Sequence, residues 1–257
     1  MNIKKHIPNF LTCCNLLCGC LAIVQAFEGN LVYSAYLVGL AAIFDFFDGF
    51  AARMLKVSSA IGKDLDSLAD MVTFGVVPGV MMFHLIYLSQ ISIGHPDLLF
   101  YGISKGSSFV NEKKGFVPIC YFGFLITIFS CIRLAKFNND TRQTDSFIGV
   151  PTPAVAIFIC SIPLIIKYNP SLGSLFITNN SLLVLCLLSF ILSLLLISEL
   201  PLFALKFKHF KWKDNEMRFV FLAMSLLLLI TLQFVGIPLI IIMYILLSIL
   251  SNFKAKT

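Results

Sequence analysis

The stretch 45–70, DFFDGFAARMLKVSSAIGKDLDSLAD, sets four aspartates at helical offsets in an otherwise apolar part of the chain. Asp45 and Asp48 are three residues apart and Asp66 and Asp70 are four apart, so each pair shares one face of a helix. The residues between the pairs, about 55–61, are expected to form a turn. In an antiparallel hairpin about that turn the pairs face each other, and Asp45 and Asp70 lie about 12 Å from the helix ends at a rise of about 1.5 Å per residue.

The facing carboxylates predict a metal site. One carboxylate inside a membrane segment costs roughly 2.5–3.5 kcal/mol on insertion scales. Arg53 is the only basic residue close to the four acids on these helix faces, so ion pairing would leave most of the charge unbalanced. Two divalent cations would neutralise it. A metal cluster at a membrane surface in turn indicates phosphate chemistry on a lipid. The expected ligands are Asp45, Asp48, Asp66 and Asp70.

Small and basic residues around the aspartates fit a bulky phosphorylated substrate. Gly49 and Ala52 leave room beside the carboxylates, and Gly62 lets the second helix begin close to the first helix or to a ligand. Arg53 offers a planar cation suited to a phosphate oxygen.

The composition predicts an all-α, polytopic transmembrane helical bundle. Hydrophobic residues make up 58% of the chain and charged residues 12%, against about 25% charged in soluble domains. Apolar runs long enough to span a membrane indicate about eight spans, with six or seven also open, and the last two form either a hairpin or one kinked element. The expected spans are 7–27, 31–53, 62–89, 116–136, 152–168, 181–199, 217–234 and 237–252.

The basic residues predict the orientation of the bundle. With the N-terminus inside, 15 of the 19 Lys and Arg residues lie on the inner side and four, Lys105, Lys113, Lys114 and Lys167, lie outside. The positive-inside rule therefore places both termini and the aspartates on the cytoplasmic side. Because the basic residues are scattered over short loops, we expect no nucleic-acid binding.

The pattern D-x-x-D-G-x-x-A-R-x8-G-x3-D-x3-D, read from Asp45 to Asp70, resembles the signature of the CDP-alcohol phosphatidyltransferase family, and every fixed position is matched. Further runs resemble the members that use serine as the acceptor; only Gly79 and Lys136 depart from the expected Ala and Arg. The resemblance implies a catalytic membrane domain at 1–155, with 156–257 as additional transmembrane helices of the same bundle. The runs are 7–12 with Asn15 and 18–19, 66–78, 133–138 and 147–154.

The resemblance implies transfer of the phosphatidyl group of CDP-diacylglycerol to L-serine, with release of CMP. Two Mg²⁺ or Mn²⁺ ions are implied, one held by Asp45, Asp48 and Asp66 and the other by Asp45, Asp66 and Asp70. Asp70 would also act as the general base. It further implies a homodimer among the lipids of a bacterial-type inner membrane. The implied CDP-lipid contacts are Pro8, Asn9, Thr12, Gly49, Ala52, Arg53, Ser59 and Gly62.

The acceptor pocket is less determined. Arg133 either binds the serine carboxylate or the lipid phosphate, or it is a positive-inside anchor; Lys136 and Ser67 are further candidates. A sibling transferase that uses glycerol 3-phosphate, inositol phosphate or choline remains an alternative. A cation transporter is a more remote one, because the inverted repeats expected of such a protein are not detected.

Overall fold

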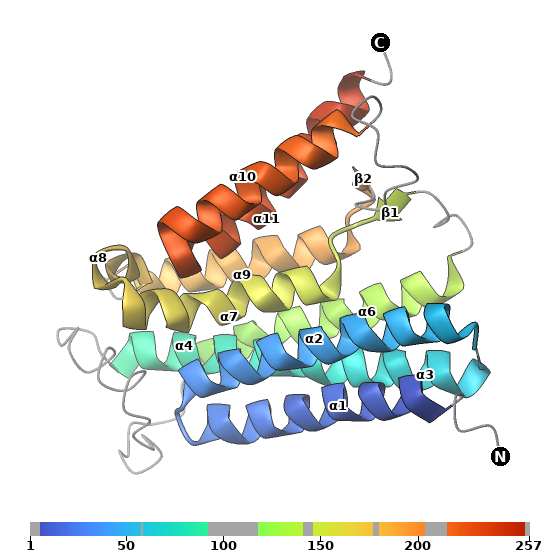
Figure 1. Ribbon diagram of the computed structural model, residues 1–257. Coiled ribbons are helices and arrows are strands. Elements are labelled where there is room, and N and C mark those ends of the chain that lie inside the picture. The colour runs from blue at the N-terminus through green and yellow to red at the C-terminus, as the bar shows by residue number, and fades with distance from the viewer. Residues whose placement is uncertain are drawn as a thin grey trace.

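The computed structural model describes residues 6–57, 59–91, 118–140, 146–176, 180–203 and 215–254. Its helices lie lengthwise beside one another in stacked layers (Figure 1). The α-helices are α1 (His6–Phe27), α2 (Leu31–Leu55), α3 (Ala60–Asp70), α4 (Val77–Ile91), α6 (Leu125–Asn139), α7 (Thr152–Tyr168), α8 (Pro170–Gly173), α9 (Ser181–Ile197), α10 (Glu216–Leu232) and α11 (Gly236–Lys254). A π-helix, η2 (Met71–Val76), joins α3 to α4, and 3₁₀ turns are η4 (Pro118–Phe124), η5 (Ser174–Phe176) and η6 (Gln233–Val235).

Most of the predicted spans are found as helices with nearly the predicted bounds. Within the described residues, five helical stretches are long and apolar enough to cross a membrane, and α7 and α9 are shorter apolar helices. This confirms the helical class and fits an integral membrane protein. The five are His6–Phe27, Leu31–Leu55, Ala60–Gln90, Pro118–Asn139 and Glu216–Ser251.

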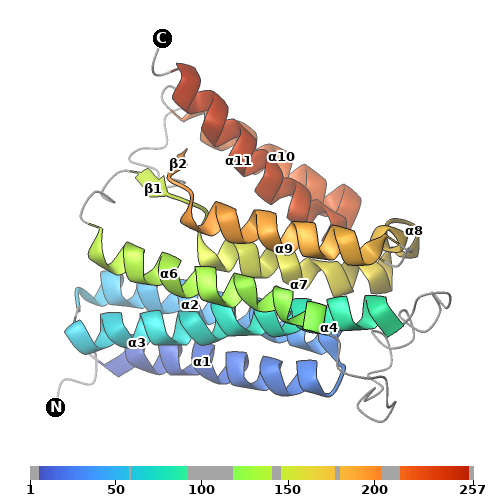
Figure 2. The ribbon, with the colours of Figure 1, turned by 180° about the vertical axis from the view of Figure 1, so that it is seen from behind.

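The last of these stretches is a hairpin, which decides between the two predicted forms. The chain bends at Gln233, whose φ is 49°, and α10 then packs along α11. Only 6% of the most apolar part of this stretch is buried. Figure 2 shows α7 and α9 between this hairpin and the layer that contains α4 and α6.

The beginning of α1, the α2–α3 turn and the end of α11 lie at one end of the bundle (Figure 1). That arrangement is the one expected when both termini share a side of the membrane. Lys105, Lys113, Lys114 and the lysines between 206 and 213 lie outside the described residues, so the orientation itself stays a prediction.

Close helix packing around η2 depends on small residues. A Cβ at Gly79 would collide with the Thr127 hydroxyl, and one at Gly75 would lie 3.3 Å from the Ser130 Cβ. The Thr127 hydroxyl donates to the Gly75 carbonyl at 3.0 Å, which satisfies an acceptor in the irregular π-helical turn. α6 is thereby held against the helix that carries Asp66 and Asp70.

A short two-stranded sheet, which the sequence did not predict, closes the same end of the bundle. β1 (Ser146–Ile148) pairs antiparallel with β2 (Pro201–Phe203). Gly149 follows β1 with a φ of 77°, a conformation that favours glycine, and its N–H donates to the Leu200 carbonyl at 2.9 Å. The residues that lead into α7 thus lie against the end of α9.

Gly123→Ala is expected to destabilise the bundle. The new Cβ would lie 2.6 Å from the Phe83 nitrogen and 3.0 Å from the Met82 carbonyl carbon, both of them backbone atoms. We expect a loss of about 1–3 kcal/mol, measured by thermal unfolding in detergent. Gly39→Ala in α2 is the matched control, because a Cβ there meets nothing within 4 Å. Equal unfolding temperatures for the two variants would contradict this packing.

Candidate metal and substrate site

The turn between α2 and α3 is built by local hydrogen bonds. Lys56 adopts a left-handed conformation with φ 51° and caps α2, its N–H directed at the Ala52 and Arg53 carbonyls. Ser59 then caps α3, its hydroxyl accepting from the Gly62 N–H at 3.0 Å. A cap of this kind fixes where α3 begins and therefore which face its aspartates occupy.

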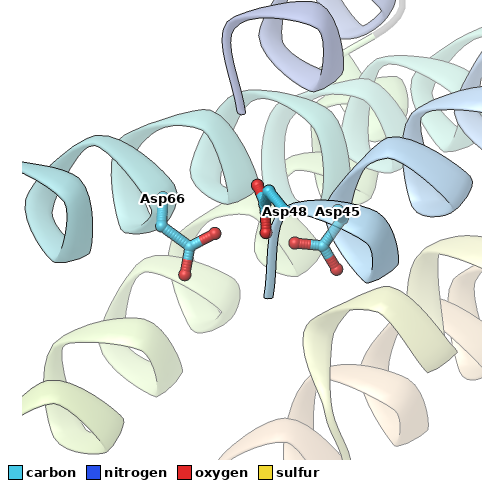
Figure 3. Close-up of side chains that lie close together, drawn as sticks. All are labelled: Asp45, Asp48 and Asp66. Carbon is cyan, nitrogen blue, oxygen red and sulfur yellow. The ribbon is translucent and has the colours of Figure 1, made fainter. Parts of the chain in front are cut away.

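Three of the predicted ligands meet. Asp45, Asp48 and Asp66 each offer a carboxylate oxygen, and these oxygens lie within 4.8 Å of one another. Figure 3 shows the three side chains pointing from α2 and α3 into a common space. Asp70 lies beside this group, with its carboxyl group in hydrogen-bonding reach of Asp45.

The cluster has no basic partner among the described residues. The side chains that interact with the four carboxylates are the other carboxylates, Thr12 and Asn15. Converging carboxylates of like charge repel one another unless a cation or a shared proton intervenes. An all-oxygen donor set of this kind suits a hard divalent cation. The residues present therefore fit a metal ion, which Asp45, Asp48 and Asp66 would hold.

α1 supplies the hydrogen bonds that orient two of these acids. The Thr12 hydroxyl donates to Asp48 Oδ2 at 2.7 Å, and the Asn15 amide donates to Asp70 Oδ1 at 3.2 Å. The two donors are three residues apart and so share a face of α1. α3 packs mainly against α1 rather than α2, which leaves space between the two acidic helices. The predicted α2–α3 hairpin is thus bridged by a third helix.

A cavity of about 250 Å³ opens beside the cluster. It reaches Asp48 and Asp66 but is not lined by Asp45 or Asp70. A Cβ at Gly49 would meet nothing within 4 Å, whereas one at Gly62 would lie 3.1 Å from Asn9 Oδ1, so Gly62 approaches α1. The lining residues are Pro8, Asn9, Thr12, Asp48, Gly49, Ala52, Val57, Ser59, Gly62, Lys63 and Asp66.

The structure brings seven of the eight predicted CDP-lipid residues to this cavity. The exception is Arg53, which is exposed at the end of α2 and does not line it. Val57 and Lys63 line the cavity but were not predicted as contacts. Both lie next to the α2–α3 turn, and the sequence of this turn indicates a polar connection without indicating which residues face a cavity.

The candidate acceptor residues differ in environment. Arg133 is only 5% exposed and its guanidinium stacks over the Phe137 ring at 5.2 Å, while Lys136 is exposed. Ser67 is tied to Asn138, whose amide donates to its hydroxyl at 2.9 Å. Arg133 Nε is buried without a hydrogen-bond partner in the described part of the chain. A plain surface anchor would not be buried in this way.

Comparison with known proteins identifies the family. Residues 5–195 match the sequence pattern of the CDP-alcohol phosphatidyltransferases. The chain belongs to this family. The prediction from the signature is therefore confirmed, and the match runs past the domain boundary predicted at 155, which stays a prediction. The chain is thus a member of a transferase family of phospholipid synthesis.

Relatives of known name share serine in their names. The chain is 33% identical to the CDP-diacylglycerol–serine O-phosphatidyltransferase of Bacillus subtilis over 168 residues, 65% of this chain and 80% of that protein. The Helicobacter pylori J99 protein of the same name is 31% identical over 59% of this chain and about half (54%) of that protein. The archaetidylserine synthase of Methanothermobacter thermautotrophicus is 30% identical over 63% and 61% of the two chains.

Thr12→Val is expected to weaken metal binding. The change keeps the shape of the side chain but removes the donor to Asp48, and a hydrogen bond to a charged group contributes about 1.5–3 kcal/mol. The metal concentration that gives half-maximal thermal stabilisation should rise roughly tenfold or more. Thr231→Val is the control, because its hydroxyl donates to the Leu227 carbonyl within α10. An unchanged metal titration for Thr12→Val would show that this hydrogen bond does not support the cluster.

Proposed function

We propose that the protein is a phosphatidylserine synthase, which transfers the phosphatidyl group of CDP-diacylglycerol to L-serine and releases CMP. The observation that carries the proposal is the junction of the carboxylate cluster with a cavity lined by the signature residues of α2 and α3. Serine as the acceptor is supported by the names of the relatives, because serine appears in the names of both the phosphatidyltransferases and the archaetidylserine synthase.

The cavity residues bind the CDP-lipid in this proposal. Asn9 and Ser59 offer polar atoms at its wall, and Gly49 leaves open space next to Asp48. Lys63 adds a cation beside the diphosphate, with Arg53 at the end of α2. Divalent ions held by the aspartates, when bound, would neutralise the diphosphate and the charge on the departing CMP. The acyl chains extend between helices into the lipid.

The chemical step replaces the phosphoanhydride bond of the CDP-lipid with a phosphate ester to serine. The serine oxygen forms a bond to the phosphorus that carries diacylglycerol, and the bond from that phosphorus to the CMP oxygen breaks. Asp70 accepts the hydroxyl proton, since a serine hydroxyl is a weak nucleophile that needs a positioned base. The Asn15 amide donates to one oxygen of Asp70 and so orients its carboxyl group. CMP leaves with the electron pair of the broken bond.

The acceptor carboxylate is assigned to Arg133. Asn138 and Thr127 of α6 bond to Ser67 and Gly75. The part of α6 that carries Arg133 therefore runs alongside the part of the chain that carries Asp70. A buried guanidinium whose Nε lacks a partner among the described residues is suited to an anionic group.

The membrane placement completes the proposal. The site end of the bundle faces the cytoplasm, where serine and CMP are soluble, and the homodimer implied by the family resemblance stays a prediction.

The proposal predicts a strict acceptor requirement. Purified protein with CDP-diacylglycerol and Mn²⁺ should release CMP with L-serine and not with glycerol 3-phosphate, inositol phosphate or choline. EDTA should abolish turnover. Asp70→Asn should reduce the rate by at least about 10²-fold, because the base is removed, while metal still binds through the other acids. Release of CMP with glycerol 3-phosphate alone would move the assignment to a sibling transferase.

Arg133→Ala tests the acceptor assignment, with Lys136→Ala as the exposed control on the same helix. Removal of a charge-assisted hydrogen bond from a buried site should raise the apparent KM for serine roughly 10- to 100-fold. The KM for CDP-diacylglycerol should not change, and Lys136→Ala should stay within about twofold. If Arg133→Ala leaves serine kinetics unaltered, Arg133 is an anchor and the carboxylate binds elsewhere.

A further inference from the structure

Asn15, in the middle of α1, is a fully buried polar residue with one satisfied and one unsatisfied end. Its amide nitrogen donates to Asp70 Oδ1 at 3.2 Å, so the orientation of the amide follows from the carboxylate, which accepts. Its carbonyl oxygen Oδ1 is buried and has no hydrogen-bond partner within the described part of the chain.

The hydroxyl of Thr73, which contacts Asn15, does not satisfy that oxygen. Thr73, one turn beyond Asp70, donates instead to the main-chain carbonyl of Asn15 at 3.3 Å. Gly19 lies against Thr73 so closely that a Cβ would collide with its hydroxyl, which holds Thr73 in this place. A buried acceptor left without a donor in a native fold calls for a ligand or an ordered water.

The charges around Asn15 favour a cationic donor. Asp70 lies beside Asp45 and is repelled electrostatically by Asp45 and Asp66. None of these acids interacts with a basic side chain in the described ranges. In such surroundings an ammonium group forms a stronger hydrogen bond than a neutral donor. Asn15 is also absent from the lining of the CDP-lipid cavity, so its Oδ1 does not face that cavity.

We propose that Asn15 selects the acceptor by binding its amino group through Oδ1. This oxygen lies next to the carboxyl group of Asp70, which accepts the proton of the acceptor hydroxyl. The inference rests on the proposed function and specifies its acceptor class as an amino alcohol. In serine the amino and hydroxyl groups stand on adjacent carbons, so they reach two neighbouring acceptors. Acceptors without an amino group leave Oδ1 unpaired, and a site built to hydrogen-bond a missing group rejects the analogue.

The test compares L-serine with 3-hydroxypropanoate, which keeps the hydroxyl and the carboxylate but lacks the amino group. The wild-type protein should prefer serine by roughly 10- to 100-fold in kcat/KM. Asn15→Leu, similar in size and without an acceptor oxygen, should bring the ratio close to one without changing the KM for CDP-diacylglycerol. Where 3-hydroxypropanoate turns over too slowly, its inhibition constant against serine replaces kcat/KM.

Two further variants separate selection from folding. Thr73→Val removes the neighbouring hydroxyl but not the Asn15 side chain, and should keep the preference for serine. Asn15→Asp keeps an oxygen for the amino group but loses the donor to Asp70, so it should slow both acceptors and keep the preference. Asn15→Asp also decides the matter if Asn15→Leu does not fold, since loss of the preference in this variant would overturn the inference.

Calorimetry supplies a readout independent of turnover. With Mn²⁺ and CMP bound, Asn15→Leu should bind serine about tenfold or more weakly and 3-hydroxypropanoate as wild type does. An equal loss for both acceptors would mean that Oδ1 holds a water, and a higher metal requirement would mean that it binds the ion; either result overturns the proposal. If the wild-type protein releases no CMP with any of the acceptors, the proposed function fails. If serine is turned over but Asn15→Leu keeps the preference for serine, only the inference about Asn15 fails.

Discussion

The convergence of the Asp45, Asp48 and Asp66 carboxylates is the constraint on which the site end of this bundle depends. Their oxygens converge within 4.8 Å, and the described residues place no Lys or Arg against them. In an apolar surrounding such a group is stable only if positive charge or protons balance it. The same imbalance makes the site useful, because cations held there can neutralise a diphosphate at the membrane boundary. The stability of the cluster and the proposed reaction therefore both require positive charge beside the carboxylates.

The rest of the fold holds those acids in place. α1 donates from Thr12 to α2 and from Asn15 to α3, so one helix face orients carboxylates on two others. Behind Asp70 the chain continues into the π-helical turn η2, where Thr127 of α6 satisfies the Gly75 carbonyl. Such turns are frequent at functional sites, because they let a side chain leave the regular helical register. The far hairpin α10–α11 is barely buried and takes no part in this arrangement.

Much of the candidate site could be read from the chain before any tertiary contact was known. The offsets of the aspartates predicted their shared faces, and the residues predicted to contact the CDP-lipid do line one cavity, apart from Arg53. The burial of Arg133 beside exposed Lys136 could not be read, since both are basic and three residues apart on one helix. The function proposed for Asn15 could not be predicted from the sequence either. A single polar residue in an apolar span gives no indication of which residue it contacts.

Sequence alone determined the helical class, the length and order of nearly all the spans, and the acidic faces of α2 and α3. These follow from local rules: apolar length sets a span, and a spacing of three or four sets a face. Only the tertiary structure decided that α1 bridges the two acidic helices, that β1 pairs with β2, and that the last two spans form a hairpin. Each of these depends on interactions between residues far apart in the chain, which arise from packing and burial and leave no periodic trace in the sequence.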